Sequence, residues 1–395
     1  MLQRQIAALV SARLRAFPAV VVVGPRQCGK TTFAKSLLPR RQGERRARYF
    51  DLEQPEERVR LDVSWAEVMS DDEVVVFDEA QADPSLFPRL RGAIDQRRSR
   101  KGRFLLLGSV APALMTQVSE SLAGRLSVVE MGPLSFLELP GGAARERLWL
   151  TGGFPDGGVR SPRAFPQWQR DYLMLLAQRD LPAWGLPSTP QTTERFFRML
   201  AAVHGQAWNA SGLGRSLGLT YHTVNAYLDR LEGAFLIRRL PSFRANIGKR
   251  LVKAPKVYWR DSGLLHALLG VRTVDDLLAQ PWVGASWEGF VIEQVIAARM
   301  QRGEPPNAHF FRTSDGREID LLIDVDGQRW AIEVKLTSSP SEADLRALDQ
   351  TADLVAADRR ILISRVADVA DGGRRVSANL PWLLEQLGRY APRTR

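Results

Sequence analysis

The stretch Ala19-Val20-Val21-Val22-Val23-Gly24-Pro25-Arg26-Gln27-Cys28-Gly29-Lys30-Thr31 decides the fold of the first part of the chain. Its first five residues form an uninterrupted apolar run, which is typical of a strand buried on both faces. The next eight fit the pattern G-x-x-x-x-G-K-[ST], and residues 31–38 read as a helix. Glycines let backbone N–H groups curve around phosphates, and the helix start adds a favourable dipole. The order of strand, loop and helix therefore predicts a phosphate-binding loop rather than a chance glycine turn.

A second apolar strand ends in two acidic residues, in the run Val74-Val75-Val76-Phe77-Asp78-Glu79. We expect both acids beside the phosphate loop, because sheets of this type bind ligands at the carboxyl ends of their strands. Asp78 and Thr31 would then hold magnesium, Glu79 would orient the attacking water, and Lys30 would reach the outer phosphates. The expected cofactors are ATP and Mg²⁺. The expected nucleotide contacts are Gly24, Pro25, Arg26, Gln27, Cys28, Gly29, Lys30, Thr31, Thr32, Asp78 and Ser109.

Phosphoryl transfer also needs positive charge near the outer phosphate, which an arginine of the same chain or of a neighbour can supply. Arg125, in Ser121-Leu122-Ala123-Gly124-Arg125, is the candidate for this role. Ser109 follows the expected strand 103–107 and stands where a polar side chain can sense the outer phosphate. Because a site within one chain often lacks its own arginine, we expect a homo-oligomer in which a neighbour donates Arg125 or a similar residue.

Composition sets the limits on function. The 395 residues are enough for two or three separate cores, and 45% hydrophobic and 25% charged residues are ordinary globular values. The formal charge of +11 favours a polyanionic partner, nucleic acid before a membrane surface. Cys28 is the only cysteine, which excludes an internal disulfide and suits the reducing cytoplasm. We expect Cys28 to fill space rather than to react. The longest apolar runs have strand length, so no membrane span is expected.

Several motifs taken together resemble one protein family. They are residues 24–32, Phe77-Asp78-Glu79-Ala80-Gln81, Leu107-Gly108-Ser109, residues 121–125 and Pro133-Leu134-Ser135-Phe136. This set looks like the prokaryotic AAA+-type ATPases that carry a C-terminal domain of unknown function. Gly152-Gly153-Phe154-Pro155 and residues 256–263 extend the resemblance over nearly the whole chain. Ser109 departs from the asparagine that is common at its position in AAA+ proteins.

Residues 211–231 read as a helix, a short turn and a second helix, which is the length of a helix–turn–helix. Polar residues stand at the start of the second helix, where a recognition helix faces the major groove of DNA. Residues 235–240 are the expected wing strand, and Lys253 and Lys256 belong to the basic segment after it. Winged helices also serve as protein-docking or oligomer-packing modules, and the sequence leaves that alternative open. The expected DNA contacts are Thr220, Tyr221, His222, Thr223, Asn225, Arg238, Arg239, Arg244, Lys249 and Arg250.

Two strands of alternating pattern follow in the last third of the chain. Side chains alternate along a strand, so Glu318 and Asp320 share one face of the first strand, and Glu333 and Lys335 share one face of the second. Asp326-Gly327 between them suits a tight hairpin turn, which would bring the two polar faces together.

Asp320, Glu333 and Lys335 in this order resemble the PD-(D/E)xK nuclease fold. The resemblance implies that Asp320 and Glu333 bind a divalent metal and that Lys335 positions the water and the phosphate. Glu288, in Trp287-Glu288-Gly289-Phe290, matches the acid that this fold often carries on a helix. The charged hairpin is equally compatible with a solvated face, or with a relic site that binds DNA without cutting it.

The expected fold class is α/β, in four parts. These are an AAA+-like P-loop ATPase domain (1–140), a helical connector (141–190), a winged helix–turn–helix (191–255) and a PD-(D/E)xK nuclease-like domain (256–395). The leading hypothesis for function is an ATP-hydrolysing motor or remodeller that acts on DNA, including branched DNA. The alternatives are an ATP-gated, metal-dependent nuclease and a nucleotide switch that docks proteins. Cleavage of DNA with magnesium or manganese distinguishes the nuclease from the motor or remodeller. An absence of salt-dependent DNA binding favours the switch that docks proteins.

Overall fold

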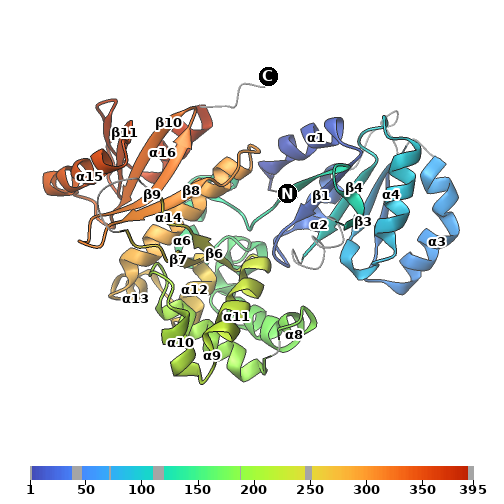
Figure 1. The fold of residues 1–395 in the computed structure, drawn as a ribbon, viewed down its shortest axis with the longest axis horizontal. Coiled ribbons are helices and arrows are strands. Elements are labelled where there is room, and N and C mark those ends of the chain that lie inside the picture. The colour runs from blue at the N-terminus through green and yellow to red at the C-terminus, as the bar shows by residue number, and fades with distance from the viewer. Residues whose placement is uncertain are drawn as a thin grey trace. The chain divides into compact units, whose positions relative to one another are not determined.

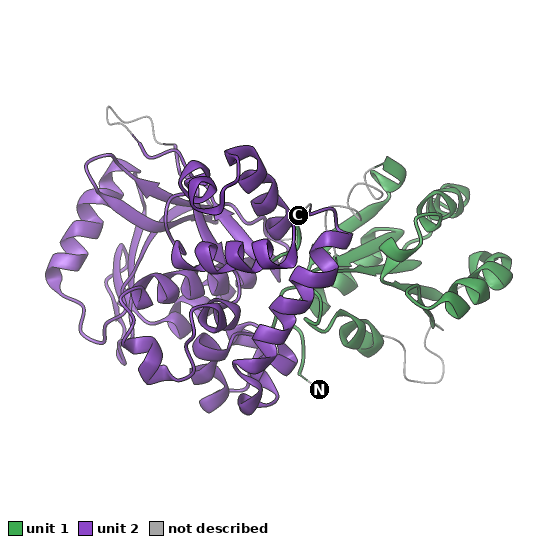
Figure 2. Cartoon of the chain, turned by 90° about the horizontal axis from the view of Figure 1, so that it is seen from below, with its two compact units in different colours: residues 1–134, 233–235 green, residues 135–232, 236–395 purple. Residues whose placement is uncertain are grey.

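The computed structural model describes residues 2–37, 47–70, 73–109, 120–186, 188–244 and 251–389. The chain divides into two compact units, shown in Figure 2. The N-terminal unit holds residues 1–134 and 233–235, and the C-terminal unit holds residues 135–232 and 236–395. Among the described residues, no helix combines the length and the apolar character that a membrane crossing requires.

The N-terminal unit alternates helices and strands. In chain order it contains α1 (Ile6–Ala16), β1 (Ala19–Val23), α2 (Lys30–Leu37), β2 (Ala47–Asp51), α3 (Pro55–Ser70), β3 (Val74–Asp78), η1 (Ala80–Ala82), α4 (Leu86–Gln96), β4 (Phe104–Gly108) and β5 (Leu126–Glu130). The strands form a wholly parallel sheet in the order β2-β3-β4-β1-β5. The predicted strand over residues 19–23 is confirmed with both its ends.

The core of this unit forms because its central strands are apolar along their whole length. Every residue of β1 and β4 is buried. Figure 1 shows α3 and α4 on one side of the sheet and α1 and α2 on the other. Val21, Phe77 and Leu106 from the sheet pack with Leu61 of α3 and Leu90 of α4. Since all strands run the same way, the loop after β1 and the acid that ends β3 lie at the same edge of the sheet.

The C-terminal unit begins with helical segments and a small two-stranded sheet. In chain order these are η2 (Phe136–Glu138), α6 (Ala143–Thr151), η3 (Pro155–Val159), η4 (Pro162–Ala164), α7 (Gln167–Leu175), η5 (Leu176–Asp180), α8 (Leu181–Ala183), α9 (Pro190–Ala202), α10 (Ala210–Leu217), α11 (Tyr221–Gly233), β6 (Ile237–Leu240), β7 (Lys256–Trp259), α12 (Ser262–Leu268) and α13 (Val274–Leu278). The helices predicted between residues 141 and 190 pack against α12, so this stretch is part of the compact unit as well as a connection.

The sheet of β6 and β7 crosses one predicted boundary. The two strands are antiparallel, with Ile237 opposite Trp259 and Leu240 opposite Lys256. A boundary between residues 255 and 256 therefore separates two hydrogen-bonded strands. The N-terminal unit holds the chain up to Leu134, six residues short of the predicted boundary at 140.

The remaining elements build a mixed sheet. They are α14 (Val283–Met300), β8 (Ala308–Arg312), β9 (Glu318–Val325), β10 (Gln328–Val334), α15 (Glu342–Leu354), β11 (Arg359–Ile363), β12 (Ala370–Asp371), β13 (Arg375–Ala378) and α16 (Leu380–Arg389). The strand order is β12-β13-β11-β10-β9-β8. The predicted hairpin is confirmed, since β9 and β10 are antiparallel on either side of Asp326-Gly327. Both turn residues have positive φ, 48° and 80°, as a tight hairpin turn requires.

Candidate functional site

The phosphate loop curves tightly at the carboxyl end of β1. A Cβ atom on Gly24 would lie only 2.0 Å from the backbone oxygen of Met131, and Gly29 has a φ of 96°. Only glycine fits both positions. Lys30 is buried, and its Nζ donates to the backbone oxygens of Gly24 at 3.0 Å and Pro25 at 2.8 Å. The lysine ammonium therefore lies inside the curve of the loop.

Other groups hold this loop from behind. Arg4 donates to the backbone oxygens of Cys28 at 2.9 Å and Gly132 at 2.7 Å. Cys28 is fully buried, with its Sγ 3.4 Å from the backbone oxygen of Met131, which agrees with a space-filling role. Thr32 and Gln27 are exposed on the outside of the loop.

Asp78 is the centre of a hydrogen-bond network beside the loop. Its Oδ2 accepts the hydroxyl of Thr31 at 2.6 Å and the hydroxyl of Tyr49 at 2.6 Å. Its Oδ1 accepts the backbone N–H of Glu79 at 3.0 Å. The structure thus brings the two predicted magnesium residues, Thr31 and Asp78, into direct contact. A hydroxyl and a carboxylate are the hard oxygen donors that Mg²⁺ prefers, so this donor set fits that ion.

Glu79 is held in a left-handed backbone conformation, with a φ of 47°. Its Oε2 accepts the hydroxyl of Ser109 at 2.8 Å and a hydrogen bond from the side chain of Gln81. Ser109 is buried, and it lies 3.4 Å from Gln81 Nε2. The predicted acid and the predicted sensor are therefore joined directly, and Gln81 completes the group.

Arg125 lies away from this group within its own chain. It directly precedes β5, whose first residue is paired with Ala19, the first residue of β1. The phosphate loop follows the other end of β1, about 17 Å away at roughly 3.3 Å per residue. Arg125 forms a two-pronged ion pair with Asp95, at 2.8 and 2.9 Å. It therefore does not reach its own phosphate loop, and donation to a neighbouring chain stays a prediction.

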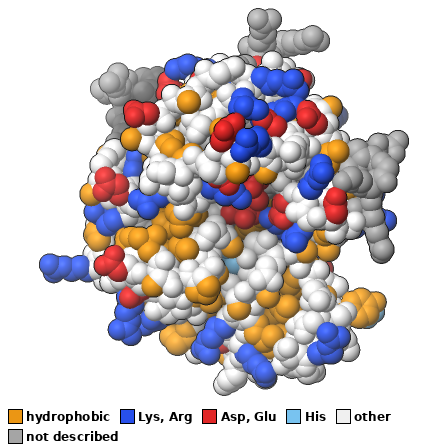
Figure 3. All heavy atoms as spheres, turned by 90° about the vertical axis from the view of Figure 1, so that its left-hand side faces the viewer, with side chains coloured by type: hydrophobic (Ala, Val, Ile, Leu, Met, Phe, Trp, Pro, Cys, Tyr) orange, Lys and Arg blue, Asp and Glu red, His pale blue; other side chains and the backbone are white. Residues whose placement is uncertain are grey.

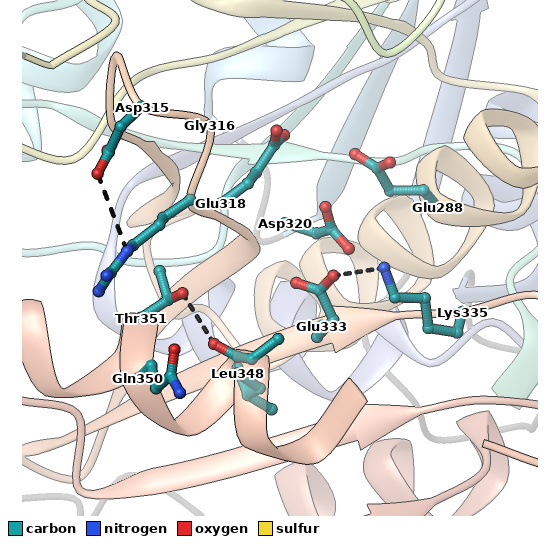
Figure 4. A pocket seen from close by; sticks show the side chains of 12 residues that line it. Glu288, Asp315, Gly316, Glu318, Asp320, Glu333, Lys335, Leu348, Gln350 and Thr351 are labelled. Atoms are coloured by element: carbon teal, nitrogen blue, oxygen red, sulfur yellow. Dashed lines mark hydrogen bonds and ion pairs between the residues drawn. The ribbon is translucent and has the colours of Figure 1, made fainter. Parts of the chain in front are cut away.

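A second group of charged residues lines a cavity of about 500 Å³ in the C-terminal unit, shown in Figure 4. Asp320 lies between Glu288 of α14 and Glu333 of β10, and Glu318 also lines the cavity. Lys335 Nζ lies 2.8 Å from Glu333 Oε1. Asp320 Oδ2 accepts the backbone N–H of Val334 at 2.9 Å, which ties β9 to β10 at this point. We call these five side chains, Glu288, Glu318, Asp320, Glu333 and Lys335, the acid–lysine cluster.

Lys256 of β7 supplies an internal positive charge to this cluster. It is buried, and its Nζ lies 2.8 Å from Glu288, 2.5 Å from Glu318 and 3.8 Å from Asp320. Burial opposes the charge on Lys256, but the three carboxylates outweigh it and raise its pKa above the ordinary value. Tyr258, two residues further along β7, donates its hydroxyl to Glu288. Lys256 is thus an internal ion-pair partner and is not available to DNA phosphates.

The carboxyl groups at the centre of the cluster resist ionisation, because they are buried and lie close to other acids. Burial raises the pKa of Asp320 well above its usual range, and the charges of Glu288 and Glu333 raise it further. Burial also raises the pKa of Glu333, although Lys335 opposes the shift. Among the described residues, Glu333 Oε2 is buried without a hydrogen-bond partner. Figure 3 shows acidic side chains gathered in the middle of one face, with Lys and Arg side chains around them.

The structure also limits the kind of metal site that this cluster can form. In the part of the chain that the structure describes, no group of three or more acidic, histidine or cysteine side chains is arranged to hold a metal ion. The metal ligands that the sequence predicts in this cluster are the two carboxylates of Asp320 and Glu333. Two carboxylates remain compatible with Mg²⁺, which usually keeps several waters and takes further ligands from substrate phosphates.

The start of α11 presents polar side chains to the solvent. Thr220, Tyr221 and His222 are exposed, and the rings of Tyr221 and His222 pack with their centroids 3.8 Å apart. Thr223 donates its backbone N–H to the Thr220 hydroxyl at 3.2 Å, which caps the helix. Asn225 is only partly exposed and accepts a hydrogen bond from the indole of Trp208 at 2.7 Å.

Two predicted DNA contacts have internal partners instead. Arg238 forms a buried ion pair with Glu293 of α14. Arg239 pairs with Glu232 of α11 and, at 2.8 Å, with Asp229. Both arginines hold β6 to neighbouring helices because strand alternation points them at acids rather than outward. Arg244 is exposed, whereas Lys249 and Arg250 lie outside the described residues.

Sequence reasoning does not identify Tyr49, Gln81 and Tyr258, and it gives Lys256 a different role. Tyr49 lies in β2, a strand with mixed polarity that the pattern of apolar residues does not single out. Gln81 belongs to the motif of residues 77–81, but the motif assigns it no role. Lys256 and Tyr258 lie two positions apart, so their side chains share one face of a strand. This spacing is the sequence feature that could have indicated that they act together.

Comparisons with known proteins assign three parts of the chain to domain families. The AAA domain family matches residues 16–139, a domain of unknown function (DUF8612) matches residues 143–275, and a second (DUF4143) matches residues 283–382. The first part of the chain is thus an AAA-type ATPase domain, a class that binds ATP, usually with Mg²⁺, and hydrolyses it.

Two curated relatives cover most of the chain. Uncharacterized protein Rv2008c of Mycobacterium tuberculosis and uncharacterized protein Mb2031c of Mycobacterium bovis are each 40% identical to it over 343 residues. The match spans 86% of this chain and 75% of each relative. The chain belongs to the same family as these two proteins, with an N-terminal AAA domain and a C-terminal DUF4143 domain.

Proposed function

We propose that this chain is a DNA-associated ATPase in which the nucleotide state changes how the C-terminal unit holds DNA. The observation that carries the first half is the meeting of Lys30, Thr31, Asp78 and Glu79 at one edge of a parallel sheet. The exposed start of α11 after a short turn, in a chain of charge +11, supports the second half.

The roles of the nucleotide-site residues follow from their positions. The backbone of residues 24–29 would enclose the phosphates, and Lys30 would exchange its carbonyl partners for phosphate oxygens. Thr31 and Asp78 would hold Mg²⁺, which neutralises charge that develops on the phosphates. Glu79 would orient and polarise the attacking water, and Ser109 and Gln81 would hold its carboxylate in place.

The DNA-binding half rests on the same unit that carries the acid–lysine cluster. α10 and α11 are two helices joined by a short turn, and β6 and β7 follow them as an antiparallel pair, which supports our proposal of a helix–turn–helix with a wing. Thr220, Tyr221 and His222 would face base edges, and Arg244 would contact phosphates. Phosphate contacts make binding strongly dependent on salt, which gives the proposal a direct readout.

The test is ATP hydrolysis by the full chain with and without DNA. We expect duplex, single-stranded or four-way-junction DNA to raise the rate, and we expect added salt to abolish the increase. The Glu79→Gln variant is the control for contaminating ATPases, because it should not hydrolyse ATP with any of the DNAs. A wild-type rate that none of the three DNAs changes would reject the DNA half and favour the protein-docking switch.

A second candidate function is metal-dependent cleavage of DNA at the acid–lysine cluster. It is favoured by the unpartnered buried Oε2 of Glu333 beside Asp320, at a cavity large enough for a phosphodiester. Asp320 and Glu333 would hold the metal, which would activate a water, and Lys335 would position that water and the phosphate.

The expected result is magnesium- or manganese-dependent cleavage that Asp320→Asn and Lys335→Ala abolish while ATP hydrolysis continues. Glu342→Gln, an exposed acid on α15, is the matched control and should cleave like the wild type. If neither metal supports cleavage of any of the DNAs that the chain binds, the cluster is better explained as a binding scaffold.

A further inference from the structure

The acid that ends β3 has a partner that the phosphate-loop motifs do not include. Tyr49 lies on β2, next to β3 in the sheet, and its hydroxyl donates to Asp78 Oδ2 at 2.6 Å. The same oxygen accepts the hydroxyl of Thr31, also at 2.6 Å. Two donors from two different elements therefore converge on one carboxylate oxygen.

The second oxygen of Asp78 is less fully occupied. Among the described residues, Oδ1 accepts one hydrogen bond, from the backbone N–H of Glu79 at 3.0 Å. A carboxylate oxygen accepts about two hydrogen bonds, so Oδ2 is saturated while Oδ1 keeps an acceptor position. With Oδ2 occupied in this way, Oδ1 is the oxygen that can accept from a metal-bound water.

Tyr49 is itself fixed by its surroundings. The ammonium of Lys35, on α2, lies 4.5 Å from the centre of the Tyr49 ring, a cation–π contact. The tyrosine thus connects the helix after the phosphate loop to the acid of the neighbouring strand.

We infer that Tyr49 is a positioning residue for magnesium: its hydroxyl holds the Asp78 carboxylate in the orientation in which it supports Mg²⁺ at Thr31. This inference rests on the ATP site described above and adds to it a residue from β2. Partners that orient metal-binding groups typically change metal affinity or activity by about 10- to 100-fold when they are removed. We therefore expect a specific loss in the magnesium-dependent part of ATP binding.

The experiment compares ATP affinity in excess Mg²⁺ and in EDTA by calorimetry, for the full chain and for Tyr49→Phe. The substitution keeps the ring below Lys35 and removes only the hydroxyl. We expect the gain in affinity that Mg²⁺ gives to fall about tenfold, with affinity in EDTA unchanged. In hydrolysis assays, the Mg²⁺ concentration for half-maximal rate should rise by a similar factor. Tyr172→Phe, which removes a hydroxyl in the C-terminal unit, should behave like the wild type.

Two results would overturn the inference. One is an unchanged magnesium-dependent gain in Tyr49→Phe, and the other is an equal loss of affinity with and without Mg²⁺, which would indicate general damage to the pocket. If the wild-type chain shows no magnesium-dependent ATP binding, the proposed nucleotide site itself is wrong. This result can be told apart from the other two because it is seen in the wild type, before any substitution is made.

Discussion

In the proposed mechanism, Lys30 and Glu79 belong to one site but act at different stages of ATP hydrolysis. Lys30 is buried inside the loop that encloses the phosphates, whereas Glu79 is held by Ser109 and Gln81 at the end of β3. Loss of the first removes charge from the bound nucleotide, and loss of the second removes the group that polarises water. Substitutions can therefore separate binding from hydrolysis.

We expect Lys30→Ala to weaken ATP binding and abolish hydrolysis, and Glu79→Gln to bind ATP with little change while hydrolysis falls by about 10²- to 10⁴-fold. Equilibrium binding of a fluorescent ATP analogue and a phosphate-release assay measure the two effects. Hydrolysis at the wild-type rate by Glu79→Gln would show that another group orients the water.

The residues of this site could be predicted where a fixed motif or the end of an apolar strand marks them. Lys30 and Thr31 follow β1 within a fixed motif, and Asp78 and Glu79 follow β3. Tyr49 and Lys256 could not be assigned in this way, because no motif marks them and their carboxylate partners lie on other elements. Asp78 ends the strand that neighbours β2, whereas Glu288 lies on the helix α14, and only the folded structure shows these contacts.

Buried histidines give the C-terminal unit a predicted dependence on pH. His266 Nδ1 donates to the backbone oxygen of Leu150, 2.9 Å away, and in the neutral ring Nε2 accepts the hydroxyl of Ser286, 2.7 Å away. Burial lowers its pKa to about 4, although the bond to Leu150 opposes the shift. Because the folded-state pKa is depressed below the ordinary 6.5, the unfolded chain binds more protons between about pH 4 and 6.5. Folding stability therefore decreases as the pH falls through this range.

His266→Gln removes the imidazole that takes up the proton. The effect of this substitution on the free energy of unfolding should therefore change with pH. The difference in the free energy of unfolding between wild type and variant should shrink as the pH falls from 6.5 towards 4, by up to about 1.36 kcal/mol per pH unit. Urea unfolding followed by tryptophan fluorescence measures it. A difference that stays constant over this range would contradict the predicted titration of His266.

At the scale of elements, the sequence predicts secondary structure best where a strand is apolar throughout or where a turn requires positive φ angles. β1 is predicted with both ends, and the turn at Asp326-Gly327 is predicted because few other residues adopt its positive φ angles. β2 is not predicted because Arg48 and Tyr49 interrupt its apolar pattern; Arg48 instead pairs with Glu73 at 2.5 Å. β7 is assigned to the following domain because a long segment separates it from β6.

The proposed helix–turn–helix of α10 and α11 gives a prediction at this scale. Arg244→Ala combined with Thr220→Ala should weaken DNA binding and lower the slope of log affinity against log salt by roughly 0.9 for each phosphate that the protein no longer neutralises. Fluorescence anisotropy with labelled DNA over a salt series measures the slope. Arg163→Ala, an exposed arginine on η4, is the matched control. The same slope in the wild type, the double variant and Arg163→Ala would mean that DNA binds to another surface or does not bind at all.

At the scale of the whole molecule, Arg125 makes assembly testable. It is held by Asp95 and does not reach the phosphate loop of its own chain. If a neighbour uses it, Arg125→Ala should lose hydrolysis by about 10³-fold or more. A mixture of Arg125→Ala with Lys30→Ala should then recover part of the rate, because mixed assemblies contain some intact sites. Full activity of Arg125→Ala alone would show that Arg125 has no role in hydrolysis beyond its ion pair with Asp95.

The central claim is that ATP at the N-terminal unit changes the hold of the C-terminal unit on DNA. The most direct test is the DNA affinity of Glu79→Gln, measured by fluorescence anisotropy with ATP, with ADP and without nucleotide, next to Lys30→Ala. Coupling between two sites typically changes affinity by about 5- to 150-fold. We predict a change of at least about fivefold between ATP and ADP in Glu79→Gln and no change in Lys30→Ala. Equal DNA affinity in every nucleotide state, or no DNA binding at low salt, would contradict the claim.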